Sequence, residues 1–361
     1  MWRTVMENAK VWFRNWHDKK ITLMLIGTGC SAILAGFSSP IWLVPLIQLF
    51  NEKLETNIPV PNSDVDYIVM VTSVAVGLLL VILGIKYRKW SNFKNKKMVQ
   101  IRHSSIEGNT YNSVRANLDD YDVIPITINQ FQDLEKIDEF NLKMAWKKQD
   151  QTINDLLVYI NDPTINEIAY MGMAHIPFQF LLGYQIADKT DVRFFEWNRT
   201  EKSWVPLTVE DESFPKLVLH KDESKQTPND VEELVIKVGI TFEIFDWQLE
   251  GHDLENLNSF YFKLEPPRLD AVTSIKQLNH YKQEFRSLLT EIHHKYQKLK
   301  KVHIFLSAQP SVAFSFGSSI SARMDSNKEF WIYNYVGSST VKYPWGIKLS
   351  KDKENGEIKI L

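Results

Sequence analysis

The stretch IAYMGMAHIPFQFLLGYQI, at residues 168–186, decides how the C-terminal part of this chain folds. Its apolar opening predicts a short buried strand that ends near Gly172. A tight turn follows, and residues 177–189 have helical length and pattern. Residues 192–197, VRFFEW, have the aromatic and β-branched composition of another strand. The stretch therefore predicts a β-α-β unit.

The same order of elements returns near the C-terminus. The stretch VHIFLSAQPSVAFSFGSSI, at residues 302–320, predicts a strand, a turn and a helix, and FWIYNYV, at 330–336, predicts the closing strand. One offset of 134 residues superposes three pairs, which are Ala174 with Ala308, Gly183 with Gly317, and Ile186 with Ile320. We infer an internal duplication of a small, nucleotide-binding-like α/β unit. A β-rich segment and a long amphipathic helix, at 211–268 and 270–300, separate the two copies of the motif.

Two long stretches near the N-terminus carry no charge. They span 31 positions at residues 21–51 and 19 positions at residues 67–85. A helix of the second length is about 28 Å long, close to the thickness of a bilayer core. In the first stretch we expect a helix to about residue 39 and then a kinked continuation, because Pro40 and Pro45 follow. Two transmembrane helices are predicted; buried core helices, or a cleaved signal peptide for the first stretch, are the alternatives.

Basic residues flank these two stretches. Five Lys or Arg side chains precede the first and six follow the second, whereas the loop between them holds Lys53 alone. The positive-inside rule therefore places both chain ends in the cytoplasm. Before the first stretch, residues 1–20 repeat tryptophan and other apolar side chains at helical spacing, which predicts an amphipathic helix in the headgroup plane or an ordinary packed helix. Small residues recur every fourth position in the first stretch, at Gly27, Ser31, Ala35 and Ser39. We expect this seam to mediate membrane assembly between helices of one chain or of several chains.

Composition excludes several kinds of function. The chain has 361 residues with 42 basic and 44 acidic side chains, and its first 97 residues carry a net charge of +6 while the remainder carries −8. An acidic bulk disfavours binding to a DNA or RNA polymer. The single cysteine, Cys30, excludes a disulfide framework and a cysteine zinc site. We find no phosphate-binding glycine loop, hydrolase motif or zinc motif, so no catalytic residue, metal or cofactor is predicted.

Ligand capture at the first turn of each half fits the pattern better than catalysis. In open α/β sheets, ligands bind beyond the carboxyl ends of the strands, where helix N-termini present free N–H groups. Two such turns would cradle a ligand with repeated phosphates. Basic side chains after the second strand would contact the phosphates, and aromatic side chains would stack on bases. The predicted ligand-binding residues are Gly172, Ala174, His175, Arg199, Lys202, Trp204, Ser307, Gln309, Pro310, Ser311 and Tyr335.

The stretches quoted above, with FFEWNRTEKSW at residues 194–204, resemble the motif blocks of the SAVED domain over about residues 125–350. That domain is the cyclic-oligonucleotide sensor of bacterial anti-phage CBASS systems and consists of two fused CARF-like halves. The resemblance implies a cyclic di- or trinucleotide ligand, supplied by a nucleotidyltransferase. With the two apolar stretches in front, the chain looks like the membrane-anchored SAVED effectors. In those proteins, ligand binding is thought to assemble a homo-oligomer that disrupts the inner membrane.

The predicted fold is thus two N-terminal transmembrane α-helices followed by an α/β cytoplasmic domain of two fused CARF-like, Rossmann-like halves. We expect an amphipathic helix at 1–20, a two-helix transmembrane region at 21–86, a basic juxtamembrane linker at 87–124 and the SAVED-like domain at 125–361. The chain is expected to be a multi-pass receptor of the bacterial inner membrane that acts in abortive infection and is not an enzyme. A membrane-tethered cyclic-oligonucleotide hydrolase using His175, and a passive membrane scaffold, are the alternatives.

Overall fold

The structure is a computed structural model that forms two compact units, Met1–Lys96 and Lys97–Leu361. It describes residues 20–34, 48, 51–53, 64–94, 96–106, 111, 114, 118, 121–186, 189–209, 213–321, 325, 327–350 and 356–361. The amphipathic helix predicted at residues 1–20, apart from its last residue, lies outside the described residues. So do Pro40, Pro45, and the seam residues Ala35 and Ser39.

The first unit contains the helix Lys20–Leu34 and helix α3, Asp64–Lys94. Their backbones approach closely at two glycines: a Cβ atom on Gly29 would lie 2.7 Å from the carbonyl oxygen of Gly77, and one on Gly77 would lie 2.6 Å from that of Gly29. The predicted seam is not this contact, because a Cβ atom on Gly27 would meet nothing within 4 Å and Ser31 is exposed. Its role between chains stays a prediction.

One described helix is long and apolar enough to cross a membrane, over Val71–Arg88 of α3. The helix Lys20–Leu34 is apolar but shorter. The exposed large apolar side chains of α3 are Val71, Val76, Leu78, Leu79, Ile82, Leu83 and Ile85. Length and composition thus support one span among the described residues, and the second span stays a prediction.

The prediction of a basic linker at residues 87–124 is wrong. Residues up to Lys94 continue α3, Lys96–Ser104 form strand β1, and Tyr121–Asn129 form strand β2. Strand β1 lies between β2 and β3 in a sheet and buries Met98, Val99 and Ile101 completely. Two of the basic residues, Lys96 and Lys97, are the first residues of this central strand, and the second unit begins at Lys97 rather than at residue 125.

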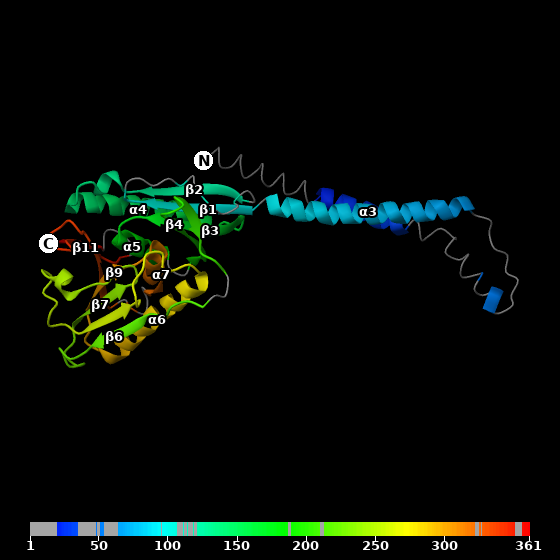
Figure 1. The fold of residues 1–361 in the computed structure, drawn as a ribbon. Helices are drawn as coiled ribbons and strands as arrows, with labels where there is room; N and C mark the ends of the chain where they lie inside the picture. Colours follow the sequence, from blue (N-terminus) through cyan, green and yellow to red (C-terminus); the bar gives the residue numbers. More distant parts are fainter. Residues whose placement is uncertain are drawn as a thin grey trace. The chain divides into compact units, whose positions relative to one another are not determined.

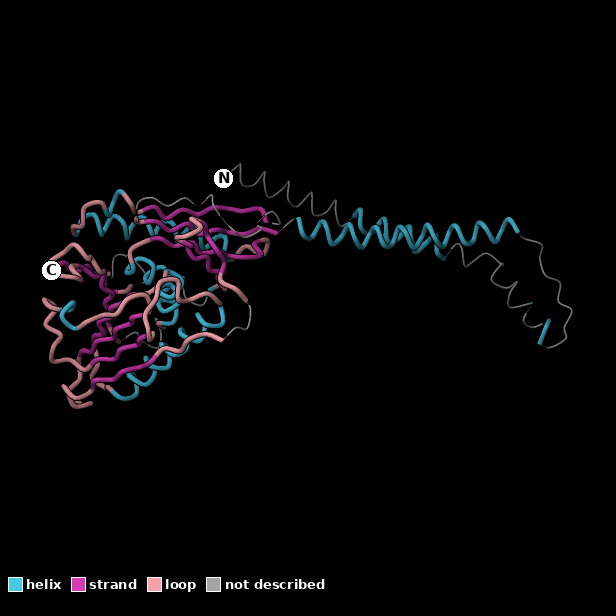
Figure 2. The backbone as a smooth tube through the Cα atoms, in the orientation of Figure 1, coloured by secondary structure: helices cyan, strands magenta, loops and turns pink. Residues whose placement is uncertain are grey.

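The second unit contains two sheets (Figure 1). The first has the order β2-β1-β3-β4-β5, with β3 at Ile165–Met173, β4 at Val192–Asn198 and β5 at Ser203–Pro206. The second has the order β12-β11-β10-β9-β7-β8-β6. Its strands are β6 Val218–Asp222, β7 Glu233–Gly239, β8 Ser259–Lys263, β9 Lys301–Ser307, β10 Glu329–Asn334, β11 Trp345–Lys348 and β12 Glu357–Ile360. The helices are α4 Glu139–Ile160, α5 Ile176–Ile186, α6 Ile275–Lys295 and α7 Pro310–Ser319, with 3-10 turns η2 at Gln132–Leu134 and η4 at Asp246–Leu249 (Figure 2).

The predicted duplication is confirmed by the strand topology. In the first sheet, β3 is parallel to β1 and β4, and β5 is antiparallel to β4. In the second sheet, β9 is parallel to β7 and β10, and β11 is antiparallel to β10. In each half one helix precedes the central strand and another follows it, which are α4 and α5 in the first half and α6 and α7 in the second.

Helices α5 and α7 pack against each other between the two sheets (Figure 1). Helix α5 contacts β10 of the second half, and α7 contacts β3 and β4 of the first. Aromatic side chains of the first sheet pack against Phe314 of α7. The ring of Tyr170 in β3 lies 4.7 Å from the Phe314 ring, and the ring of Phe194 in β4 lies 5.3 Å from the Phe314 ring. One hydrophobic core therefore runs through both halves.

Candidate functional site

The first turn of α5 begins where strand β3 ends, and Ser105 holds it. The backbone N–H of His175 donates to Ser105 Oγ at 2.7 Å, and His175 Nδ1 lies 2.7 Å from the same oxygen. Ser105 directly follows β1, and β1 is parallel to β3, so the two strand ends meet at one edge of the sheet. Burial lowers the pKa of His175 to about 4, which keeps the imidazole neutral at neutral pH.

This turn also touches the second half. The His175 ring lies 5.8 Å from the ring of Trp345 in β11, and Phe178 in the next turn lies 6.0 Å from it. Trp345 pairs with Asn334 at the carboxyl end of β10. The first turn of α5 therefore lies against the ligand edge expected for the second sheet.

The first turn of α7 is held by a hydrogen bond to the first half. Ser311 N–H donates to Glu196 Oε1 in β4 at 2.9 Å. The preceding residue, Pro310, has no N–H group, so Ser311 presents the first free donor of the helix. Burial raises the pKa of Glu196 to about 7, although its hydrogen bonds to Ser311 act in the opposite direction. A carboxylate of the chain thus already occupies the place where the sequence predicted a ligand phosphate.

The offset of 134 residues relates Gln309 to His175, and the Gln309 side chain is hydrogen-bonded to the backbone of Val272. Its Oε1 accepts from Val272 N–H at 2.6 Å and its Nε2 donates to the Val272 carbonyl at 3.1 Å. The side chain is buried, so in this structure it positions the segment before α6 instead of facing solvent. The equivalent turns are therefore built differently: one ends in a half-buried histidine and the other in a buried amide.

The remaining predicted residues divide by exposure. Arg199 and Lys202 lie in the exposed turn between β4 and β5, where cationic side chains can reach a ligand. Tyr335 is 47% exposed and its ring lies 5.5 Å from that of Tyr343. Trp204 is fully buried and stacks on Tyr111 at 5.5 Å, so it offers no free face to a base.

The small predicted residues shape the two strand ends. A Cβ atom on Gly172 would lie 2.3 Å from the Tyr170 hydroxyl, so glycine gives that hydroxyl its space. The carbonyl of Ala174 accepts a hydrogen bond from Gln179 Nε2. Ser307 Oγ lies 2.9 Å from Thr241 Oγ1 and accepts from Phe242 N–H at 3.1 Å. These contacts leave Ser307 tied to the segment after β7.

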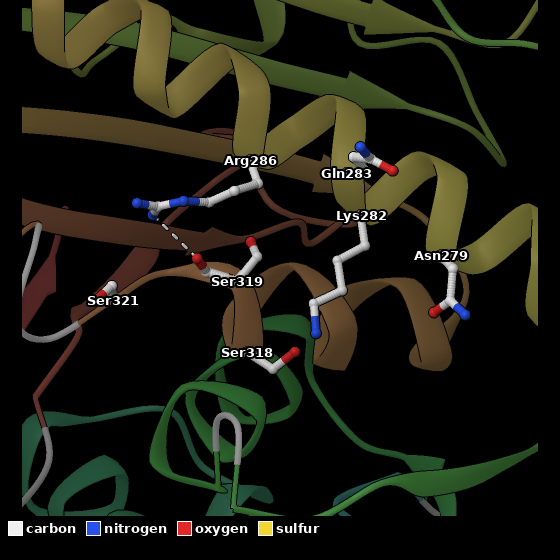
Figure 3. Close-up of a pocket in the computed structure, with 7 residues that line it drawn as sticks. All are labelled: Asn279, Lys282, Gln283, Arg286, Ser318, Ser319 and Ser321. Atoms are coloured by element: carbon white, nitrogen blue, oxygen red, sulfur yellow. Dashed lines mark hydrogen bonds between the residues drawn. The ribbon is translucent and has the colours of Figure 1, made fainter.

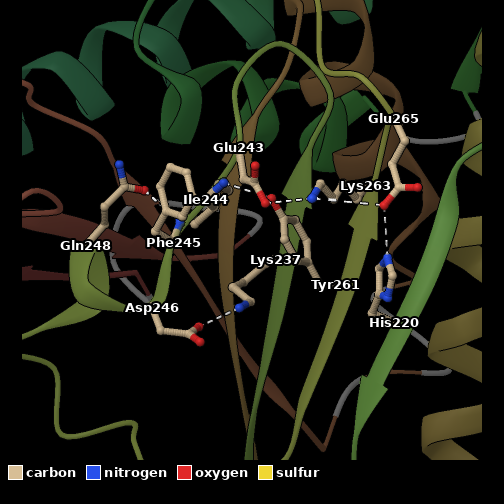
Figure 4. Close-up of polar contacts among 10 residues, drawn as sticks. All are labelled: His220, Lys237, Glu243, Ile244, Phe245, Asp246, Gln248, Tyr261, Lys263 and Glu265. Atoms are coloured by element: carbon tan, nitrogen blue, oxygen red, sulfur yellow. Dashed lines mark hydrogen bonds and ion pairs between the residues drawn. The ribbon is translucent and has the colours of Figure 1, made fainter.

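That segment carries exposed aromatic side chains that sequence reasoning missed. Phe242, Phe245 and Trp247 are 61%, 47% and 54% exposed. Polar contacts hold the segment, including Lys263 to Glu243 at 2.6 Å and Ile244 N–H to the Tyr261 hydroxyl at 2.8 Å (Figure 4). The signal was present as an aromatic-rich run directly after the buried strand β7, but it lies inside the segment 211–268 that the sequence predicted only as β-rich. Phe242 lies next to Ser307 in this structure and offers a free aromatic face at the second strand end.

The first helical turn of each α/β half thus contacts the other half, His175 with Trp345 and Ser311 with Glu196. The family model of the SMODS-associated and fused to various effectors sensor domain, SAVED, matches residues 149–349. The chain therefore belongs to the SAVED family. No curated protein matches the chain.

Three solved structures from Acinetobacter baumannii are similar to the chain. A Cap4 SAVED/CARF-domain containing receptor with the cyclic trinucleotide 2'3'3'-cAAA shows 14% identity and a TM-score of 0.45, covering 80% of this chain and 59% of that one. The receptor with 3'3'3'-cAAA shows 12% identity and a TM-score of 0.44, covering 91% and 77%. The structure described as the receptor alone shows 11% identity and a TM-score of 0.43, covering 91% and 76%. The chain thus spans about three-fifths of the first of these proteins.

Proposed function

We propose that this chain is a membrane-attached receptor that binds a cyclic oligonucleotide in bacterial antiviral defence. The observation that carries the proposal is a SAVED sensor domain following a helix apolar enough to cross a membrane. Cyclic trinucleotides are the ligands named for the Acinetobacter receptor, and the proposal assigns a cyclic di- or trinucleotide to this chain. A nucleotidyltransferase would supply it.

The proposed ligand lies over the first turns of α5 and α7. Arg199 and Lys202 contact its phosphates, because both are exposed beside the strand that carries Glu196. Phe242 replaces Trp204 as the aromatic side chain that stacks on a base. Glu196 opposes a phosphate at Ser311 until the carboxylate is protonated or moves away, so its raised pKa favours ligand entry.

Membrane damage is the proposed output. The pair of helices joined at Gly29 and Gly77 carries no charged side chain over residues 21–34 and 67–85, so a single pair offers no charged path for ions. We propose that ligand-bound receptors assemble and bring many spans together. The exposed positions Gly27 and Ser31 are the proposed contact between chains. The receptor then sits in the inner membrane with both ends in the cytoplasm.

A binding experiment with product analysis tests the function. The full chain in neutral detergent is titrated with cyclic di- and trinucleotides by calorimetry, and the recovered ligand is analysed by chromatography. We expect saturable binding of at least one ring and an increase in particle mass by light scattering. Recovered linear products would favour the hydrolase alternative, and absence of binding across the panel would reject the receptor.

A further inference from the structure

A groove between α6 and the end of α7 encloses about 400 Å³ (Figure 3). Asn279, Lys282, Gln283 and Arg286 line it from α6, and serines from the end of α7 line the other side. Spacings of three and four residues place these α6 side chains on one face of the helix. Among the residues that the structure describes, those lining the groove are all polar, and they include two cations and no acid. The volume is within the range of small-molecule sites.

Arg286 is fixed in this groove by the end of α7. Its guanidinium Nη1 donates to the Ser319 carbonyl at 3.1 Å and to Asp325 Oδ2 at 2.7 Å. A cation at a helix C-terminus complements the unpaired carbonyl groups there, so Arg286 has a structural task. Asp325 offsets one positive charge and holds the guanidinium in place.

Lys282 differs from Arg286 in its partners. It forms no ion pair with any residue that the structure describes. It points from α6 toward Ser318 at the end of α7 (Figure 3). An isolated lysine on a convex surface is simply hydrated, but Lys282 projects into a concave polar groove beside a fixed guanidinium. The Ser318 and Ser319 hydroxyls already donate to the Ser315 and Phe316 carbonyls. The donors that the groove offers to phosphate oxygens are therefore the Lys282 ammonium and the carboxamides of Asn279 and Gln283.

We propose that this groove binds a phosphate group, with Lys282 as its principal contact. Two sources carry that chemistry: a soluble phosphorylated compound and the headgroup of an anionic phospholipid. The groove shares none of its lining residues with the proposed cyclic-oligonucleotide site at the first turns of α5 and α7. The inference is therefore independent of the proposed function, and either can fail alone.

Chemical labelling of the intact chain tests the site. The full chain in neutral bicelles is acetylated in short pulses, with inorganic phosphate or with chloride at equal ionic strength, and in bicelles containing phosphatidylglycerol without phosphate. Mass spectrometry compares Lys282 with Lys298, an exposed lysine beyond α6. We expect roughly fivefold or greater protection of Lys282 alone, because a bound anion masks its ammonium group. Protection by phosphate indicates a soluble ligand, and protection only by the anionic bicelle indicates a headgroup.

A variant pair completes the test. Phosphate should raise the unfolding temperature of the chain. The Lys282→Gln variant should need about tenfold more phosphate for the same rise, while Lys298→Gln should need the same concentration as the parent. Equal protection of both lysines, or an unprotected Lys282 in every arm, would overturn the site. A protected Lys282 in a chain that binds no cyclic nucleotide would uphold the site and reject only the receptor.

Discussion

Gly183 of α5 lies directly against the backbone of Phe314 in α7: a Cβ atom on Gly183 would be 1.9 Å from the Phe314 carbonyl oxygen. The equivalent glycine, Gly317, repeats the contact with the Phe180 carbonyl at the same 1.9 Å. The offset of 134 residues that relates the two glycines also relates the two phenylalanines. The duplicated halves therefore meet through a reciprocal backbone contact that only glycine permits.

Gly183→Ala should destabilise the second unit by about 3 kcal/mol or more, because the backbone of α7 must move to admit the methyl group. Gly337→Ala is the control, since its Cβ atom would have ordinary contacts at 3.5 Å. Urea unfolding of the two variants measures the difference. Equal stabilities would show that α5 and α7 separate without cost.

Glu196→Gln should stabilise the fold above pH 7 and have little effect near pH 5. Burial raises the folded-state pKa of Glu196 to about 7, so stability is lost as the carboxyl ionises and is regained as pH falls toward its unfolded value near 4.5. Glutamine keeps an acceptor for Ser311 N–H without the charge. Each kcal/mol corresponds to roughly 2–4 °C in unfolding temperature. A pH-independent difference between variant and parent would contradict this.

His103→Gln should flatten the acid limb of the stability curve. Burial lowers the pKa of His103 to about 4, and its Nε2 lies 2.9 Å from Gln130 Oε1. The unfolded chain therefore binds a proton below pH 6.5 that the folded chain does not, so stability falls from pH 6.5 toward pH 4. Removing His103 should reduce the slope of the free energy of unfolding against pH, between pH 4 and 6.5, by the amount that corresponds to about one proton. If the unfolding temperatures of parent and variant changed with pH in the same way, His103 would not be the source of the acid sensitivity.

Arg199→Ala should weaken cyclic-oligonucleotide binding about ten- to a hundredfold, the effect of losing one charged phosphate contact. Lys147→Ala removes an equal charge from the exposed face of α4 and should leave the affinity unchanged. Calorimetry on the full chain compares the two. Equal losses would indicate a general charge effect, and no loss in Arg199→Ala would move the ligand elsewhere.

Ser31→Leu should block ligand-induced membrane depolarisation without separating the two helices of a chain, because Ser31 is exposed. Gly29→Leu should instead force those helices apart, since Gly29 meets the backbone of Gly77. Depolarisation in cells and crosslinking between chains report the two effects. A Ser31→Leu protein that still depolarises cells at equal expression would remove the seam from the mechanism.

Local pattern predicted much of the fold. Strands β3, β4, β9 and β10 and helices α5 and α7 were identified from short apolar runs and helical spacing, because a buried strand and its helix leave their signature in neighbouring residues. The duplication was also readable, since equivalent contacts retained the same glycines at one offset. Strand β1 was missed because its lysine-rich start masked a short apolar run that is buried only by pairing with β3.

The site was less predictable. The sequence placed Arg199 and Lys202 directly after a strand, where the structure has an exposed turn, and their contact with a ligand stays a prediction. Trp204 was assigned to a ligand and lies in the core. An indole in a strand has the same local pattern whether its face meets a base or Tyr111. The difference depends on which distant segment covers it.

The amino-acid sequence by itself determined the apolar stretch that forms α3, the strand-helix-strand order β3-α5-β4 and β9-α7-β10, and the repeat that relates these two units. These follow from interactions between residues close in the chain. Only the tertiary structure decided that Glu196 meets Ser311, 115 positions away, that Gln309 clasps Val272, and that Lys282 projects into a groove ending at Ser318. Such pairs form because the two sheets pack across α5 and α7. Contacts between segments far apart in the chain leave no periodic pattern of residues, so the sequence alone does not reveal them.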